Sequence, residues 1–277
     1  MTSNLQMEQK VEVKATKFAK RLHQSSRTLF GIAIAGQMLF VYYIVAFYGG
    51  IVVTGQYEKV NNQLGHGIVE GDPVGNAMLA IHIFLAAVIT FGGPLQFSTA
   101  LRNRFPVFHR WNGRIYIITA FIISFAGLYM NATRGAHGGF INSMGNFLNA
   151  SLIMGFSVMA WRTAMQRKFM APKKWALRAF LMVSGVWFFR IGYGLWLLLT
   201  GFSGIGVTSN LTGPFDRFLS FGHSLVPLLI LELYFFAKSH PNFQVKKWTS
   251  AFLALLCLLL VGGIAVISMI FWLPVLH

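Results

Sequence analysis

Seven long apolar runs constrain this chain more than any other feature of its sequence. A helix needs about 20 consecutive apolar residues to cross the hydrocarbon core of a bilayer. Seven runs reach that length: Leu29–Val53, Val74–Leu101, Ile115–Thr133, Ser143–Trp161, Trp175–Leu199, Phe215–Phe236 and Ser250–Trp272. The sequence therefore predicts an all-α fold, a polytopic transmembrane helical bundle of about seven spans.

The composition agrees with lipid as the main surroundings of the chain. Of its 277 residues 55% are hydrophobic and only 11% are charged, whereas a soluble domain carries about 25% charged residues. The net charge of +16 would suggest nucleic acid as the partner of a soluble protein. Here the basic residues lie between apolar runs, so we expect a lipid bilayer and no nucleic acid. The single Cys257 excludes intramolecular disulfides and cysteine-ligated clusters.

The basic side chains are distributed unevenly between the two sides of the predicted bundle. With the N-terminus inside, 19 of the 23 Lys and Arg residues fall in inner segments and three in outer loops, while Arg190 lies within a span. Cytoplasmic loops carry such an excess of positive charge. We therefore predict the N-terminus in the cytoplasm and, with seven spans, the C-terminus outside.

Residues 1–28 differ from the apolar remainder of the chain, residues 29–277, which we interpret as a single transmembrane domain. Met7, Val11, Phe18 and Leu22 recur at roughly helical spacing among lysines. This pattern is typical of a basic amphipathic helix that binds anionic lipid of the inner leaflet. A partly disordered basic tail is the alternative.

Three polar side chains are expected at the same depth in the outer half of the membrane. His82 and His223 each lie eight residues into runs that enter from outside, and Arg190 lies nine residues before the outer end of its run. At 1.5 Å per residue, all are about 12 Å below the outer boundary. Charged groups within spans usually mark a site.

The pair of histidines has three interpretations. His82 and His223 could ligate the iron of a haem b, with Arg190 as the counter-charge of a propionate. They could instead form interhelical hydrogen bonds that only hold helices together. In the third interpretation this layer binds a quinone, a proton or another small substrate. Haem b and a quinone are thus the candidate cofactors, and no metal other than haem iron is expected.

A second set of polar residues is expected near the inner boundary. Glu232 and Gln96 lie at similar depth, and Arg110 or Arg114 could pair with Glu232 and lower its desolvation cost. The loop Arg102–Arg114 also contains His109, which could meet lipid phosphate, a propionate or a quinone headgroup. Anchoring of the loop at the interface would explain these residues equally well.

Two motifs carry a resemblance to a known family. IHIFLAAVITFGGPLQF (Ile81–Phe97) and FPVFHRWNGRIY (Phe105–Tyr116) resemble an uncharacterised family of predicted bacterial membrane proteins with a GPLQF…HRWxGRxY pattern. Trp175, Arg178, Arg190 and Glu232 resemble later positions of the same family. The resemblance implies a multi-pass protein of the bacterial inner (cytoplasmic) membrane, and it implies no reaction.

Three function classes follow from these observations. The leading one is a redox-associated membrane protein that binds haem b or quinone within the bundle. The second is a transporter or small-molecule-binding protein that uses His82, Arg190 and Glu232. The third is a non-enzymatic sensor or accessory subunit with unknown protein partners. No P-loop, HExxH or dinucleotide fingerprint is present, which argues against ATP-driven transport and leaves open whether the protein is an enzyme.

Overall fold

The computed structural model describes residues 2–64, 67–166 and 171–276, and this part of the chain is helical without a strand. The elements are α1 (Thr2–Thr54), η1 (Tyr57–Val60), α2 (Pro73–Phe97), α3 (Thr99–Arg104), α4 (Pro106–Thr133), α5 (Gly139–Met165), α6 (Ala171–Val183), α7 (Gly185–Leu199), α8 (Pro214–Ser239), α9 (Phe243–Ile267), η2 (Ser268–Trp272) and η3 (Pro274–Leu276). The predicted all-α bundle is confirmed.

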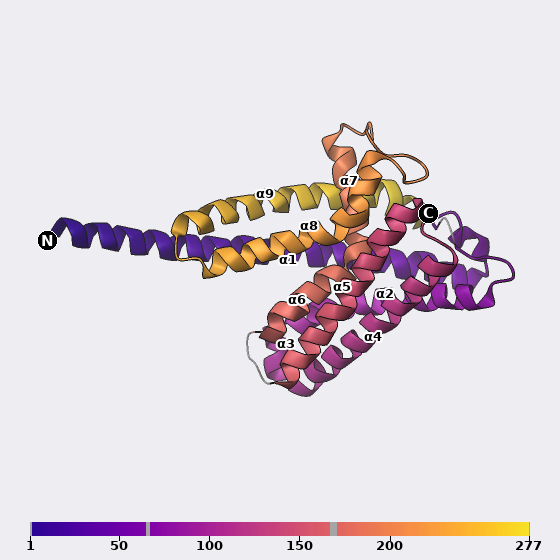
Figure 1. The fold of residues 1–277 in the computed structure, drawn as a ribbon, viewed down its shortest axis with the longest axis horizontal. Coiled ribbons are helices and arrows are strands. Elements are labelled where there is room, and N and C mark those ends of the chain that lie inside the picture. The colour runs from indigo at the N-terminus through magenta and orange to yellow at the C-terminus, as the bar shows by residue number, and fades with distance from the viewer. Residues whose placement is uncertain (1, 65–66, 167–170, 277) are drawn as a thin grey trace.

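The helices form two groups that diverge from one end of the molecule (Figure 1). In the first group α8 and α9 run alongside the middle of α1, with which α9 packs extensively, and the N-terminal end of α1 projects beyond them. In the second group α2, α4, α5 and α6 pack in sequence, α2 on α4, α4 on α5 and α5 on α6. Contacts of α1 with α2 and of α5 with α8 join the two groups.

Five helices are long and apolar enough to cross a membrane, namely α1, α2, α4, α8 and α9 with its continuation. The pair α6 and α7, bent by 60° at its break, is a sixth span if the two helices together cross the membrane as one broken span. The predicted run Ser143–Trp161 lies in α5, which is not among them and which carries three asparagines, at positions 142, 146 and 149. By length and composition the structure therefore has five or six spans where the sequence analysis expected about seven.

The long helix α1 passes through residue 28 without a break. Leu22 is only 3% exposed and packs with Ala237 of α8 and Leu253 of α9. The segment that the sequence separated from the membrane domain thus continues its first helix and contributes to one of its hydrophobic clusters.

The segment Arg102–Arg114, expected to be a loop, is mostly helical. Only Phe105 separates α3 from α4, and Pro106 is the first residue of α4. Proline favours the first helical position because its missing N–H has no intrahelical acceptor there and its fixed φ suits a helix. His109, Arg110 and Arg114 therefore lie on the first turns of a 28-residue helix.

Glycines allow close approach at several helix crossings. A Cβ on Gly194 of α7 would collide with the backbone carbonyl of Gly263 in α9. A Cβ on Gly145 of α5 would collide with the carbonyl of Ser220 in α8. Small residues at such crossings let helices pack by direct backbone contact, which is a main source of helix association in lipid.

Candidate functional site

The two buried histidines engage different helices. His82 of α2 has its Nδ1 3.0 Å from the carbonyl oxygen of Ile123 in α4. His223 of α8 has its Nδ1 3.0 Å from the carbonyl oxygen of Leu219 in its own helix, and its ring meets Phe189 of α7 edge to face. No hydrogen bond or ring contact of the described residues joins the two imidazoles. Their ligation of one haem iron stays a prediction.

Arg190 lies apart from the hydrogen bonds of both histidines. Its guanidinium is 5.2 Å from the ring centre of Phe40 on α1. Its one hydrogen bond within the described structure is a long one, 3.5 Å from Nη1 to the carbonyl oxygen of Val186. The guanidinium is not part of either ion pair found in that structure.

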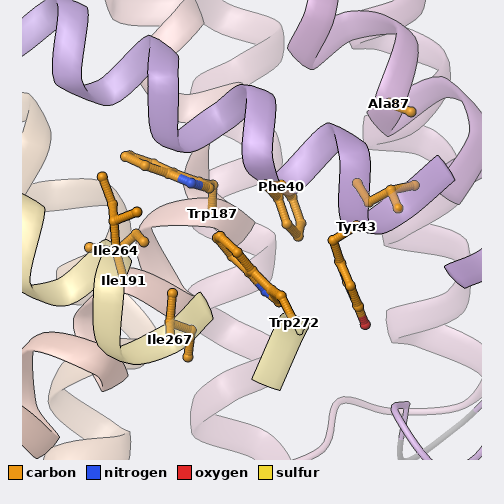
Figure 2. Close-up of a cluster of buried hydrophobic side chains, with 9 residues drawn as sticks. Phe40, Tyr43, Ala87, Trp187, Ile191, Ile264, Ile267 and Trp272 are labelled. Atoms are coloured by element: carbon orange, nitrogen blue, oxygen red, sulfur yellow. The ribbon is translucent and has the colours of Figure 1, made fainter. Parts of the chain in front are cut away.

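Phe40, over which the Arg190 guanidinium lies, belongs to a compact group of aromatic side chains (Figure 2). Phe40 and Tyr43 of α1 face Trp272 of η2, with ring centres 5.3 Å and 6.1 Å from the indole. The interplanar angles are 32° and 21°, so these rings are close to parallel. We call Phe40, Tyr43, Arg190 and Trp272 the Arg190 site.

Several buried polar atoms around this site have no hydrogen-bond partner in the part of the chain that the structure describes. The indole N–H groups of Trp187 and Trp272 are unpaired although the two residues are only 1% and 3% exposed. The amide of Gln37 donates to Ser184 Oγ at 2.8 Å, but its Oε1 is unpaired. An unpaired buried polar group costs about 1–3 kcal/mol. The unpaired donors therefore indicate that an acceptor, from water or a ligand, belongs there.

The end of α9 changes helix type next to these atoms. Residues Ser268–Trp272 form a π-helix, and the N–H of Leu273 donates to the carbonyl oxygen of Ser268. Single π-turns are rare and often occur at functional sites, because the extra residue redirects the side chains that follow. Here Trp272 ends that turn and lies against α1.

Glu232 pairs with an arginine other than those the sequence suggested. Arg178 of α6 donates from Nε to Oε1 at 2.6 Å and from Nη2 to Oε2 at 2.9 Å. Arg110 and Arg114 are exposed on α4 and do not reach it, so their predicted pairing with Glu232 is wrong. The reason is geometric, because α6 rather than α4 packs against α8.

Gln96 and His109, both predicted site residues, do come together. Their Nε2 atoms are 3.4 Å apart, and Asn112 donates to Gln96 Oε1 at 3.0 Å. Asn112 also donates to the carbonyl oxygen of Gly92 at 3.1 Å. This cluster joins α2 to α4 within the two motifs. Hydrogen bonds between these helices are therefore sufficient to explain the polar residues at these positions.

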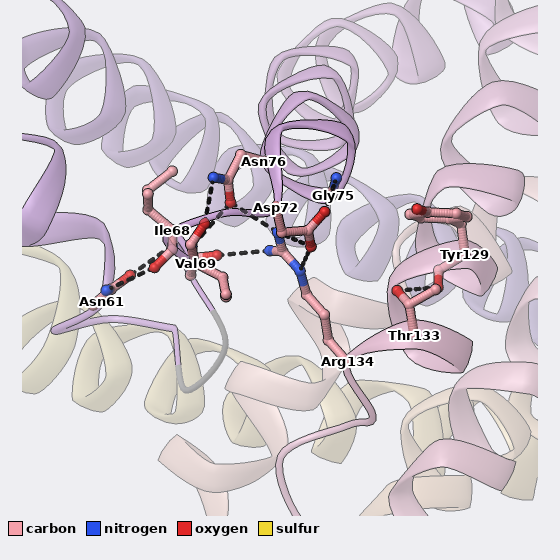
Figure 3. A network of polar contacts seen from close by, with 10 residues as sticks. Asn61, Ile68, Val69, Asp72, Gly75, Asn76, Tyr129, Thr133 and Arg134 are labelled. Carbon is pink, nitrogen blue, oxygen red and sulfur yellow. Dashed lines mark hydrogen bonds and ion pairs between the residues drawn. The ribbon is translucent and has the colours of Figure 1, made fainter.

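Arg134 organises the segment that joins α1 to α2, a role that the sequence analysis did not assign. It donates to Asp72 Oδ2 from Nε at 2.9 Å and from Nη2 at 2.7 Å (Figure 3). It also donates to Asn76 Oδ1 and to the carbonyl oxygen of Gly67. Asp72 caps α2 by accepting from the Gly75 N–H at 2.8 Å. The Asp-Pro start of α2 was the one sequence signal for this cap.

Asp72 makes the segment that joins α1 to α2 sensitive to acid. The Gly75 N–H, and then Arg134, hold the pKa of the Asp72 carboxyl below its usual 3.8. A lowered pKa in the folded protein stabilises it above the unfolded pKa, and the stabilisation disappears as pH falls through the folded value. We expect Asp72→Asn to lower Tm at pH 7. The difference in Tm between the variant and the native protein should become smaller as pH falls below 3.8.

The matched control is Glu70→Gln, because Glu70 is an exposed carboxylate in the same loop. Tm in detergent is measured from pH 7 to pH 2.5 for the three proteins. An Asp72→Asn difference that is constant over this range would contradict a role for carboxylate ionisation.

A buried acid holds together the loop between α7 and α8. Asp216 is fully buried and accepts from the hydroxyl of Tyr193 at 2.7 Å and from the N–H of Gly213 at 2.8 Å. The N–H of Thr208 donates to the same carboxylate at 3.0 Å. With its oxygens satisfied in this way, Asp216 is a structural cap of α8.

The fold and these clusters define the class of the protein as an all-helical membrane protein with several membrane-spanning helices. Residues 79–206 match the model of a family described as predicted membrane protein, DUF2306. The matched segment includes both motifs and is similar to that family. No curated protein and no solved structure matches the chain.

Proposed function

We propose that the protein is a redox-associated membrane protein that binds a quinone at the Arg190 site. The observation that carries the proposal is a guanidinium within the helical bundle that lies over an aromatic ring and has no carboxylate partner among the described residues. An arginine in a span costs about 2.5–3.5 kcal/mol on insertion scales, and such residues usually pair with an acid or serve a site.

The hydrogen-bonding capacity of this site suits an acceptor. A guanidinium has five N–H donors, and the long bond to Val186 occupies one of them. The Trp272 N–H adds an unpaired donor on the facing helix. A quinone supplies two carbonyl acceptors on a flat ring, and its negative charge on reduction would be stabilised by the nearby cation.

The aromatic side chains suit the quinone ring itself. Phe40, Tyr43 and Trp272 present nearly parallel rings, and aromatic pairs in offset stacks gain about 0.5–1.5 kcal/mol beyond the area they bury. The site also lies among apolar side chains of α1, α7 and α9, which an isoprenoid-bearing molecule dissolved in the bilayer can approach.

The test is quinone binding by the purified protein, with short-chain ubiquinone and menaquinone analogues as probes. We expect tryptophan fluorescence to be quenched on titration, because two indoles lie at the site. Arg190→Ala should raise Kd by tenfold or more, since a charge-assisted hydrogen bond contributes about 1.5–3 kcal/mol. The matched control is Arg217→Ala, an exposed arginine on the first turn of α8. A native protein that binds neither probe, or equal Kd values for the two variants, would contradict the proposal.

Haem b is a second candidate because of the orientation of His82. With its Nδ1 bonded to the Ile123 carbonyl, the neutral ring leaves Nε2 as the free lone pair, as in many iron-ligating histidines. The visible spectrum of protein from haem-replete cells tests this candidate. A Soret band that His82→Ala abolishes would support haem at His82. A colourless folded protein would contradict haem binding.

A further inference from the structure

A basic groove lies where α1 meets α8 and α9, at the end of the bundle that the charge distribution predicts to be inside. Two adjoining hollows, of about 550 and 270 Å³, share His23. Lys20 and Arg27 line the first together with Gln24 and Thr28 of α1. The second is lined by Lys238 of α8 and Lys246 of α9. We call Lys20, His23, Arg27, Lys238 and Lys246 the basic groove.

The charges of the groove are not neutralised by the protein. None of these five side chains takes part in an ion pair found in the described structure. The chain has only seven acidic residues, and the carboxylate of Glu232 is already taken by Arg178. Four cations from three helices therefore converge without a neighbouring carboxylate. A bound anion would supply the missing negative charge.

The groove has a rigid floor. Beneath it Leu22 packs with Ala237 and Leu253, at 3%, 0% and 1% exposure. At the same end Phe18 of α1 stacks on Phe243 of α9, with ring centres 6.0 Å apart. These contacts fix α1 against α8 and α9, so the backbone positions that carry the cations are set before any ligand binds, which reduces the entropy lost on binding.

The depth of the groove matches the headgroup layer. Arg27 is 27 residues before Thr54 at the other end of α1, which corresponds to about 40 Å along a helix. The hydrocarbon core is about 30 Å thick, and a bilayer with its headgroups about 40–45 Å. The second hollow also has apolar walls from Ala19, Leu22 and Tyr234, which a free ion would not need and a glycerol backbone would contact.

We propose that the basic groove is a specific site for the phosphate-bearing headgroup of an anionic phospholipid. Basic pockets between transmembrane helices on the cytoplasmic side bind such headgroups. The polar side chains of Gln24 and Thr28 add hydrogen bonds to phosphate oxygens. The site is separate from the Arg190 site, and neither proposal depends on the other.

The test is native mass spectrometry of the full-length protein with phosphatidylglycerol or phosphatidylcholine added in detergent. We expect phosphatidylglycerol to bind with higher affinity. Each basic residue contributes about a factor of five near an anionic surface, so Lys20→Ala/Arg27→Ala should weaken binding about 25-fold. The matched control is Lys59→Ala/Arg217→Ala, which removes two charges from the predicted outer side.

Three results would overturn the proposal: equal binding of the two lipids, equal losses in the two double variants, or displacement of the lipid by inorganic phosphate at the same concentration. The last result would assign the groove to free phosphate. If the α1 variant does not fold, Lys238→Ala/Lys246→Ala removes the cations of the opposite wall, and an unchanged affinity there contradicts the site.

Discussion

Gly145→Ala is expected to destabilise the protein strongly, by about 2–3 kcal/mol, within the usual range for overpacked cores. The added methyl group would overlap the backbone carbonyl of Ser220, and no change of rotamer can move a backbone atom. Helices α5 and α8 would have to separate. Their contact is one of those that join the two groups of helices, so Tm in detergent should fall and aggregation should increase.

The control for this substitution lies on the same helix. Gly155 is also in α5, and a Cβ there would meet no atom within 4 Å. Gly155→Ala should be neutral or stabilising by up to about 1 kcal/mol, because alanine is the better helix former. If the two variants have the same Tm, direct contact of α5 with α8 at Gly145 does not occur in the membrane protein.

The ion pair of Arg178 with Glu232 is expected to give a coupling free energy of about 2 kcal/mol in a double-mutant cycle. This value lies between those for exposed and buried pairs, because the side chains are 17% and 42% exposed. Both carboxylate oxygens are engaged, which favours a strong pair. Arg178→Ala, Glu232→Gln and the double variant are compared by their stability in detergent.

The two single variants should differ. Without Glu232, the Arg178 guanidinium retains its contacts with two aromatic rings. The ring centre of Trp175 is 4.5 Å from it and that of Phe235 is 5.5 Å from it. Without Arg178, Glu232 keeps no described hydrogen-bond partner, so Arg178→Ala should be the more damaging change and Glu232→Gln should partly rescue it. Arg162→Ala, at an exposed arginine near the end of α5, is the control. Additive effects of Arg178→Ala and Glu232→Gln would show that the pair contributes nothing.

The position of Glu232 illustrates how far sequence reasoning reaches at an individual site. Its depth and its need for a cationic partner follow from the sequence, because a carboxylate near the hydrocarbon core is costly when unpaired. The identity of the partner depends on which helix packs against α8. Arg110, Arg114 and Arg178 satisfy the same depth criterion, and only the neighbouring position of α6 selects Arg178.

The same distinction applies to the candidate site. The sequence identified Arg190 as a charge within a span and placed it at the depth of His82 and His223. Depth is one coordinate, and the direction around each helix is not determined by it. The structure directs His82 toward α4, His223 toward its own helix and α7, and Arg190 toward α1. Phe40 and Tyr43 join the site together with Trp272, which is more than 200 positions away in the sequence.

The sequence by itself determined that this protein is an all-helical membrane protein, because the length and apolarity of a span are local properties of consecutive residues. It also located the polar positions that a bilayer makes costly. Only the tertiary structure decided the partners of those positions, the bend between α6 and α7, the continuity of α1 and the basic groove beside it. Each of these depends on helix packing, which is set by side-chain shape and close backbone contact between residues distant in the chain.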